Sequence, residues 1–283
     1  MLRSPLLLLL CLLGLIQINY AQSGWTRPQG TYYLQAQAGF FSSNDYYGTA
    51  GDHFPSDNSF QAFQINLYGE YGIHNRLTVL LQTPLQINSF SNTESVYGLG
   101  NIELGLKYRL LPNWPLSFAV ELDIPTDDGI LFASAKEPNE LGIIEQINLP
   151  ASDGEFNVWS TLAASQSSAD GKTFGSVYTR FNFRTEDFSN QWQSGFELGR
   201  NLHERLLVIA KLRVQGRFSD MPSSTGSFLY GEGTTFTAAG LTGMYQIADH
   251  WRLVGTYNYT GGWLIDQRNS YRGSTFSLGV AYE

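Results

Sequence analysis

The sequence is poor in cysteine and in charged residues. Its single cysteine, Cys11, allows no internal disulfide and leaves a cysteine-based zinc site short of ligands. Charged residues make up 15% and aromatic residues 14% of the chain, a composition that fits neither a disordered chain nor a coiled coil. The net charge of −8 argues against a basic surface for nucleic acid. We therefore expect no bound metal or cofactor and no nucleic-acid partner.

Long apolar runs are also absent, except at the N-terminus. Arg3 precedes an apolar run from Leu6 to Ile16, and the small residue Ala21 follows before a polar stretch, which is the order of a secretory signal peptide. The run is shorter than the roughly 20 residues that cross a bilayer as a helix. We expect export with cleavage near Ala21, and hence a signal peptide (1–21), a short periplasmic segment (22–30) and a β-domain (31–283).

The exported part shows apolar or aromatic residues at every second position, which is the period of β-strands. In 99–111, for example, Ile102, Leu104 and Leu106 alternate with Glu103 and Lys107, so that one face is apolar and the other ionised. Pro84 donates no ladder hydrogen bond and predicts a bulge or an early end of the third strand. The pattern predicts twelve strands, at about 31–41, 60–71, 77–88, 99–111, 116–124, 155–166, 174–184, 191–199, 206–218, 234–247, 251–259 and 274–283.

The connections between these strands alternate in length. Short turns are expected at 72–75, 112–115, 200–205 and 248–250, and long segments at 42–59, 89–98, 125–154, 219–233 and 260–273. An even number of strands, with short turns at one end and long loops at the other, is typical of antiparallel outer-membrane barrels. Several runs reach the about 9–11 residues that span a bilayer at a tilt, whereas globular strands average about 5–6. We therefore predict an all-β transmembrane up-and-down barrel of about twelve strands in the outer membrane, with a soluble β-domain as the alternative.

Within such a barrel, one face of each strand lines an enclosed space. Ionised groups there need water or opposite charge, so they either brace the barrel as ion pairs or set the selectivity of a pore. The sequence groups three acids, Glu103, Glu121 and Asp123, on adjacent strands. It places Lys211, Arg213 and Arg217 on one strand near Arg180 and Arg184, which predicts walls of opposite charge. The inward set is Glu70, Glu103, Lys107, Arg109, Glu121, Asp123, Arg180, Arg184, Glu197, Lys211, Arg213, Arg217 and Arg252.

Twelve strands lie between the eight that side chains fill and the sixteen that leave a wide channel. The openness of the pore therefore depends on the loops. Segment 125–154 carries Ile143, Ile144, Ile147 and Leu149, and we expect it either to cap the mouth or to fold inward as a plug.

Several stretches resemble the outer-membrane barrels grouped as the transporter family of the MetA pathway of phenol degradation. They are residues 24–30 followed by Tyr32, residues 75–79, 98–109 and 122–127, so the similarity covers the first half of the chain best. It implies a passive channel for small, aromatic or apolar, compounds. The final strand, with Phe276, Leu278, Val280 and Tyr282 on one face, resembles the closing strand that the barrel-assembly machinery recognises. The partners implied are this machinery, outer-membrane lipid and a small solute.

Two other functions are compatible with the predicted barrel. One is a non-conducting structural or surface-binding barrel whose loops carry the function. The other is a lipid-modifying enzyme, which would need a histidine beside a serine near the outer leaflet. Three of the four histidines, His74, His203 and His250, fall in the short turns, and no GxSxG motif is present. The fourth, His53, lies in a long segment near Asp52 and Asp57. These three residues could bind a metal ion, but an exposed polar loop is the more frequent reason for such a group. We therefore predict no enzymatic activity.

Overall fold

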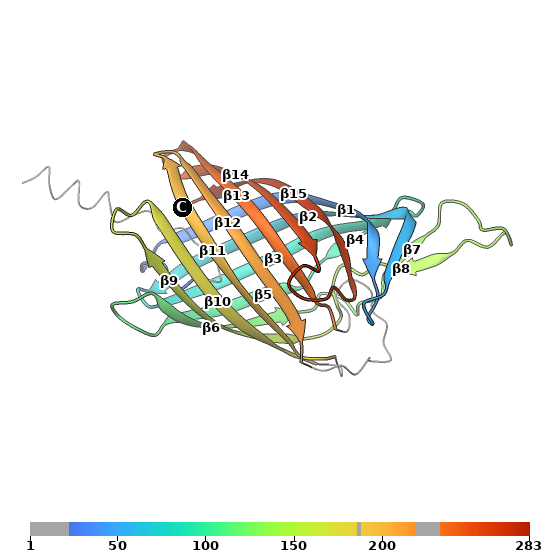
Figure 1. Cartoon of the computed structure of the whole chain (residues 1–283), viewed down its shortest axis with the longest axis horizontal. Helices are drawn as coiled ribbons and strands as arrows, with labels where there is room; N and C mark the ends of the chain where they lie inside the picture. Colours follow the sequence, from blue (N-terminus) through green and yellow to red (C-terminus); the bar gives the residue numbers. More distant parts are fainter. Residues whose placement is uncertain (1–22, 186–187, 219–232) are drawn as a thin grey trace, which may run out of the picture.

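The computed structural model describes residues 23–185, 188–218 and 233–283, so the expected signal peptide and its cleavage site lie outside the described residues. All of the secondary structure in these ranges is β (Figure 1). The strands are β1 (Tyr32–Tyr47), β2 (His53–His74), β3 (Leu77–Phe90), β4 (Val96–Leu99), β5 (Ile102–Arg109), β6 (Leu116–Ile124), β7 (Phe132–Ser134), β8 (Gln146–Asn148), β9 (Asn157–Ser167), β10 (Thr173–Arg184), β11 (Gln191–His203), β12 (Leu206–Arg217), β13 (Phe236–Ala248), β14 (Trp251–Gly261) and β15 (Ser270–Tyr282).

Twelve of these strands form one closed antiparallel barrel. Each pairs with its neighbour along the chain, β1 pairs with the last strand β15, and β2 pairs with β3, so that the ring has no free edge. β4 extends the wall beside β3, while β7 and β8 form a separate two-stranded hairpin in the segment between β6 and β9. In Figure 1 the strands run obliquely across the barrel and this hairpin stands beyond its wall. The prediction of a twelve-stranded antiparallel barrel is confirmed.

The two faces of the wall differ as the alternation predicts. Along β5, Leu104, Leu106 and Tyr108 are exposed on the outside, whereas Gly105 and Lys107 between them are buried. The same pattern holds around the ring, so the exterior is an apolar band and the interior is polar and ionised. No helix in the described part of the chain is long and apolar enough to cross a membrane. In the following, the short-turn end is the end with the connections at 75–76, 110–115, 168–172, 204–205 and 249–250, and the long-loop end is the opposite one.

Several strands extend into the expected connections: β11 runs to His203 in the expected turn 200–205, and β15 begins at Ser270 in the expected segment 260–273. Two further differences are larger. The expected long connection 42–59 is wrong in extent, because β1 and β2 stay paired up to Tyr47 and His53, with a bulge between Ser43 and Asp45. Backbone pairing continues where the side chains stop alternating, since a hairpin in water needs no apolar face. The interruption expected at Pro84 falls on the neighbouring strand instead. β3 is continuous, but its partner changes from β5 to β4 opposite Pro84, whose carbonyl accepts from the N–H of Gly100 at 2.7 Å.

A charge on the apolar exterior should destabilise the barrel in a depth-dependent way. Leu104→Arg lies near the middle of β5 and should lower the free energy of unfolding in lipid vesicles by about 2–4 kcal/mol. Leu110→Arg, the matched control on the same face just beyond the end of β5, should cost only about 0–1 kcal/mol. Urea titration of both variants in the same vesicles measures the difference. Equal losses would show that this face does not meet hydrocarbon.

Candidate functional site: the interior of the barrel

The predicted inward residues are all buried or half-buried, whereas the apolar side chains that alternate with them along much of the wall are exposed. The structure brings most of them together as ion pairs. Their number and their small exposure mean that they brace the interior. Whether they also select ions stays a prediction.

The first group of ion pairs joins β5, β6 and β10. One guanidinium nitrogen of Arg180 lies 2.6 Å from Glu121 Oε2 and 3.9 Å from Glu103 Oε1, and its plane stacks on the ring of Trp159, 4.0 Å from the centroid. The hydroxyl of Thr161 donates to the other Glu121 oxygen at 3.0 Å. The Glu121 side chain is fully buried, so Arg180 is the counter-charge on which that carboxylate depends.

A second pairing lies closer to the short-turn end. Glu70 on β2 is buried and lies 3.7 Å from Lys107 Nζ, and it accepts a hydrogen bond from Tyr68 at 2.5 Å. Its other oxygen lies 3.1 Å from Nε of Arg27, which comes from the chain before β1. The sequence prediction missed Arg27. The signal available was that Arg27 is the one charged residue between the expected signal peptide and the first strand.

The remaining predicted residues fall into smaller groups. Arg184 pairs with Glu155, Arg252 lies 2.5 Å from Glu283, and Lys211 lies 3.6 Å from Glu197. Asp123 faces Glu103 in the register of β5 and β6, and Arg109 ends β5 at the short-turn end. Arg213 stacks over Phe236 at 5.1 Å, and Arg217 ends the same strand, β12.

These contacts change the expected division into walls of opposite charge. Arg180 and Arg184 extend toward acidic partners, so they belong to the acidic side of the interior. The basic neighbourhood is therefore reduced to β12, where Lys211, Arg213 and Arg217 share the inward face and Lys211 is itself paired with Glu197.

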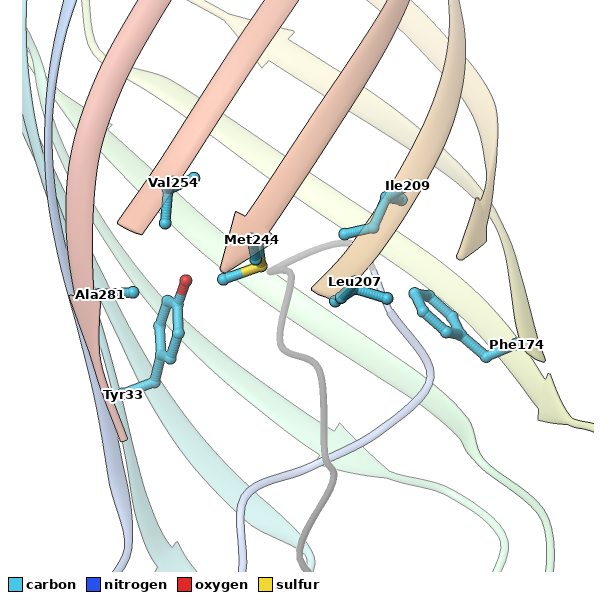
Figure 2. Close-up of a cluster of buried hydrophobic side chains, with 7 residues drawn as sticks. All are labelled: Tyr33, Phe174, Leu207, Ile209, Met244, Val254 and Ala281. Atoms are coloured by element: carbon cyan, nitrogen blue, oxygen red, sulfur yellow. The ribbon is translucent and has the colours of Figure 1, made fainter. Parts of the chain in front are cut away.

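Apolar side chains fill the interior at the short-turn end. Figure 2 shows seven of them converging from the strand ends, and we call them the short-turn cluster: Tyr33, Phe174, Leu207, Ile209, Met244, Val254 and Ala281. Trp25, from the chain before β1, packs against the cluster, edge-on to Phe174 at 5.8 Å. Of the segment that the sequence predicts to be periplasmic, residues 23–27 lie within this end of the barrel, with Ser23, Thr26 and Arg27 buried, while Gln29 and Gly30 are exposed. Its periplasmic location stays a prediction.

A second cluster closes the long-loop end. We call it the outer aromatic cluster; it consists of Phe41, Tyr46, Phe60, Phe90 and Tyr271, with Phe60 and Tyr271 stacked at 4.6 Å. Ala133 on β7 and Leu149 after β8 pack against it and are almost fully buried.

The base of segment 125–154 thus covers the long-loop mouth of the barrel. The tip of the segment does not cover it, because Ile143 and Ile144 are exposed. Asn101 anchors the segment to the wall, since it accepts from Ser152 and donates to Asp153, both at 2.6 Å. Burial raises the pKa of Asp153, although the amides of Asn101 and Asn157 oppose this shift.

A cavity of about 250 Å³ lies beside the outer aromatic cluster. Phe41, Phe60 and Tyr271 form its apolar part, and Gln64 and Asn88 contribute amides. Its other lining residues are Gly39, Ala62, Gln86, Thr234, Phe236, Thr260, Ser270 and Thr275. The cavity combines flat apolar rings with a few polar groups, which is the usual character of a small-molecule site.

The histidines lie apart from this interior. His74, His203 and His250 are at the short-turn end, and His53 begins β2 at the long-loop end. His53 Nε2 lies 2.7 Å from Asp45 Oδ1 rather than beside Asp52 or Asp57. Among the residues that the structure describes, no three histidine, cysteine or acidic side chains are placed to hold a metal ion.

Comparison with known proteins places the fold among outer-membrane barrels. No family model matches the sequence, and no curated protein matches it. A solved structure, the COG4313 outer membrane channel from Pseudomonas putida F1, is 15% identical with a TM-score of 0.62, covering 94% of this chain and 99% of that one. The translocator domain of the autotransporter NalP from Neisseria meningitidis is 11% identical (TM-score 0.52; 90% and 89% covered).

The CymD monoaromatic hydrocarbon channel is 8% identical, with a TM-score of 0.50 and coverage of 91% of this chain and 89% of that one. The likeness shows the fold. At these identities it assigns no activity to the chain.

Proposed function

We propose that this protein is a passive channel for small molecules in the outer membrane of a Gram-negative bacterium. The observation that carries the proposal is the closed wall with an apolar exterior and a polar, ionised interior, because such an interior admits water while the exterior meets hydrocarbon. With the usual orientation of such barrels, the short-turn end faces the periplasm. β15 then serves as the closing strand for the barrel-assembly machinery.

We propose further that the transported molecules are small aromatic or apolar compounds. The cavity beside the outer aromatic cluster supports this proposal, since Phe60 and Tyr271 offer ring faces to a flat solute. The resemblance of residues 24–127 to a phenol-degradation transporter family supports it too. The CymD structure, whose fold this chain shares, is a monoaromatic hydrocarbon channel.

A surface-binding role is the second candidate. It is favoured by the exposed apolar tip of segment 125–154, where Leu141 is 82% and Ile143 is 56% exposed. Exposed apolar groups of this kind often mark a binding surface.

Planar-bilayer recording of the purified protein separates the two candidates. A channel should give discrete current steps, and removal of residues 132–148 should increase the step size because it uncovers the outer aromatic cluster. Benzyl alcohol should reduce the current of the wild type by occupying the cavity, and it should act less on Phe60→Ala. Leu141→Ala at the exposed tip is the matched control and should behave like the wild type.

The absence of current steps from the wild type, from the shortened variant and from a variant that also lacks residues 23–27 at the short-turn end would exclude the channel. Current steps that benzyl alcohol leaves unchanged would exclude the aromatic solutes alone.

A further inference from the structure

The chain before β1 crosses the short-turn mouth of the barrel from within. At one side the N–H of Gly24 donates to Ser165 Oγ on β9 at 2.8 Å, and the carbonyl of Ser23 accepts from Ser117 on β6 at 3.0 Å. At the other side the N–H of Arg27 donates to Thr78 Oγ1 on β3 at 2.8 Å. β3 and β9 are separated by two strands in the ring, so the segment cuts across one part of the mouth as a chord rather than following the wall, and Trp25 extends from it to Phe174 on β10.

The wall is shaped to receive this segment. A Cβ on Gly24 would lie 1.9 Å from the carbonyl oxygen of Pro115, and a Cβ on Gly72 would lie 2.1 Å from that of Pro28. Either contact is far shorter than a side chain permits, so glycine is needed both in the segment and in the wall. Two backbones thus approach each other closely at two separate points.

The segment is nevertheless held by side chains and not by a strand ladder. Its main anchors are the ion pair of Arg27 with Glu70, the stacking of Arg27 over Tyr33 at 5.1 Å, and the contact of Trp25 with the short-turn cluster. Segments outside the ladder open at lower free energy than the strands around them. Moreover, Ser23 Oγ and Arg27 Nη2 are buried without a hydrogen-bond partner in the described structure, a cost that release into water removes.

The point of rotation is also evident. Gly30 has a φ of +79°, its N–H donates to the carbonyl of Gly72 at 2.8 Å, and the N–H of Thr31 donates to Pro28 at 3.1 Å. Residues 28–31 therefore form a turn fixed to β2, and the chain that precedes this turn can leave without disturbing β1.

We propose that residues 23–27 are a built-in gate, which closes the short-turn mouth when Arg27 is paired with Glu70 and opens it by withdrawing about the 28–31 turn. The proposal rests on the channel function. It makes the closed state an autoinhibited one, with Trp25 and Arg27 occupying the path that a solute would take through the ionised interior to the periplasm.

The test compares three variants with the wild type in planar bilayers, each chain starting at Gln22. Deletion of residues 23–27 should raise the mean conductance several-fold over the wild type. Arg27→Met should raise the fraction of time spent open, because the Glu70 anchor is lost while Trp25 remains. In the double variant Ser23→Cys with Ser117→Cys, oxidation should hold the gate shut and dithiothreitol should restore the current. The chain from Gln22 contains no other cysteine, and Ser23→Cys alone under the same oxidant is the control.

Each outcome is decisive for the gate. If the deletion conducts like the wild type and the oxidised pair conducts like the reduced pair, the gate is wrong and the channel stands. If no protein conducts, including the variant without residues 132–148, the channel is wrong and the gate with it. Should the deletion fail to fold, as shown by loss of heat-modifiable migration on gels, the oxidised and reduced forms of the cysteine pair still give the answer within one folded protein.

Discussion

Replacing Arg180 with methionine should lower the free energy of unfolding by about 3–5 kcal/mol, because it leaves the carboxylate of Glu121 buried without a counter-charge. The side chain of Glu121 has no exposure, and besides Arg180 it accepts a hydrogen bond from the hydroxyl of Thr161. That hydroxyl compensates the charge only in part. Urea titration in lipid vesicles measures the loss.

Arg213→Met is the matched control for this variant. Arg213 also faces the interior, but it stacks on Phe236, and no ion pair to it is found in the described structure. Arg213→Met should lower the free energy of unfolding by about 0.5–2 kcal/mol. The double variant Arg180→Met with Glu121→Gln should recover most of the stability, since the uncompensated charge is gone. Equal losses for Arg180→Met and Arg213→Met would contradict the bracing role of the Arg180 pair.

Reversing the charge of β12 should change the ion preference of the channel. Lys211, Arg213 and Arg217 point inward at alternate positions of one strand, and their replacement by glutamate turns a basic wall acidic. A positive wall concentrates anions, whereas a negative wall concentrates cations. We expect the reversal potential in a salt gradient to move toward cation preference.

The order of the substitutions matters. Lys211 lies 3.6 Å from Glu197, so Lys211→Glu adds repulsion between two carboxylates, while Arg213→Glu does not break an ion pair found in the described structure. Among the three single substitutions, Arg213→Glu should therefore shift the reversal potential with the least loss of stability. Lys172→Glu with Arg205→Glu, both in short turns and exposed, is the control outside the interior. An unchanged reversal potential in the triple variant would show that β12 only supports the wall.

The sequence by itself was sufficient to predict the strands of the barrel wall. Alternation in 99–111 reflects the two sides of a strand, and a one-residue slip would place Glu103 and Lys107 in hydrocarbon, so the register of each strand is strongly determined. The same reasoning identified the inward residues without a structure. It could not tell which of them pair, because Arg180 and Glu121 lie on strands that are not neighbours along the chain.

Segments whose residues do not alternate between apolar and polar gave no signal of their position. The continuation of β1 and β2 above the wall is held by backbone pairing and by cross-strand contacts such as those of Tyr46 with Phe54 and of Tyr47 with His53. The base of segment 125–154 covers the outer aromatic cluster through Ala133 and Leu149, although Ile143 and Ile144 looked equally suited in the sequence. Which apolar residue of a loop is buried depends on where the loop is anchored, here by Asn101.

What the sequence determined, then, is the alternating wall, its twelve strands and the direction of its side chains, because the period of a strand is a local property of the chain. Only the tertiary structure decided what occupies the interior. The closure of the ring brings Glu70, Lys107 and Thr78 around Arg27, and Phe174 beside Trp25, across distances in the sequence that no local pattern encodes.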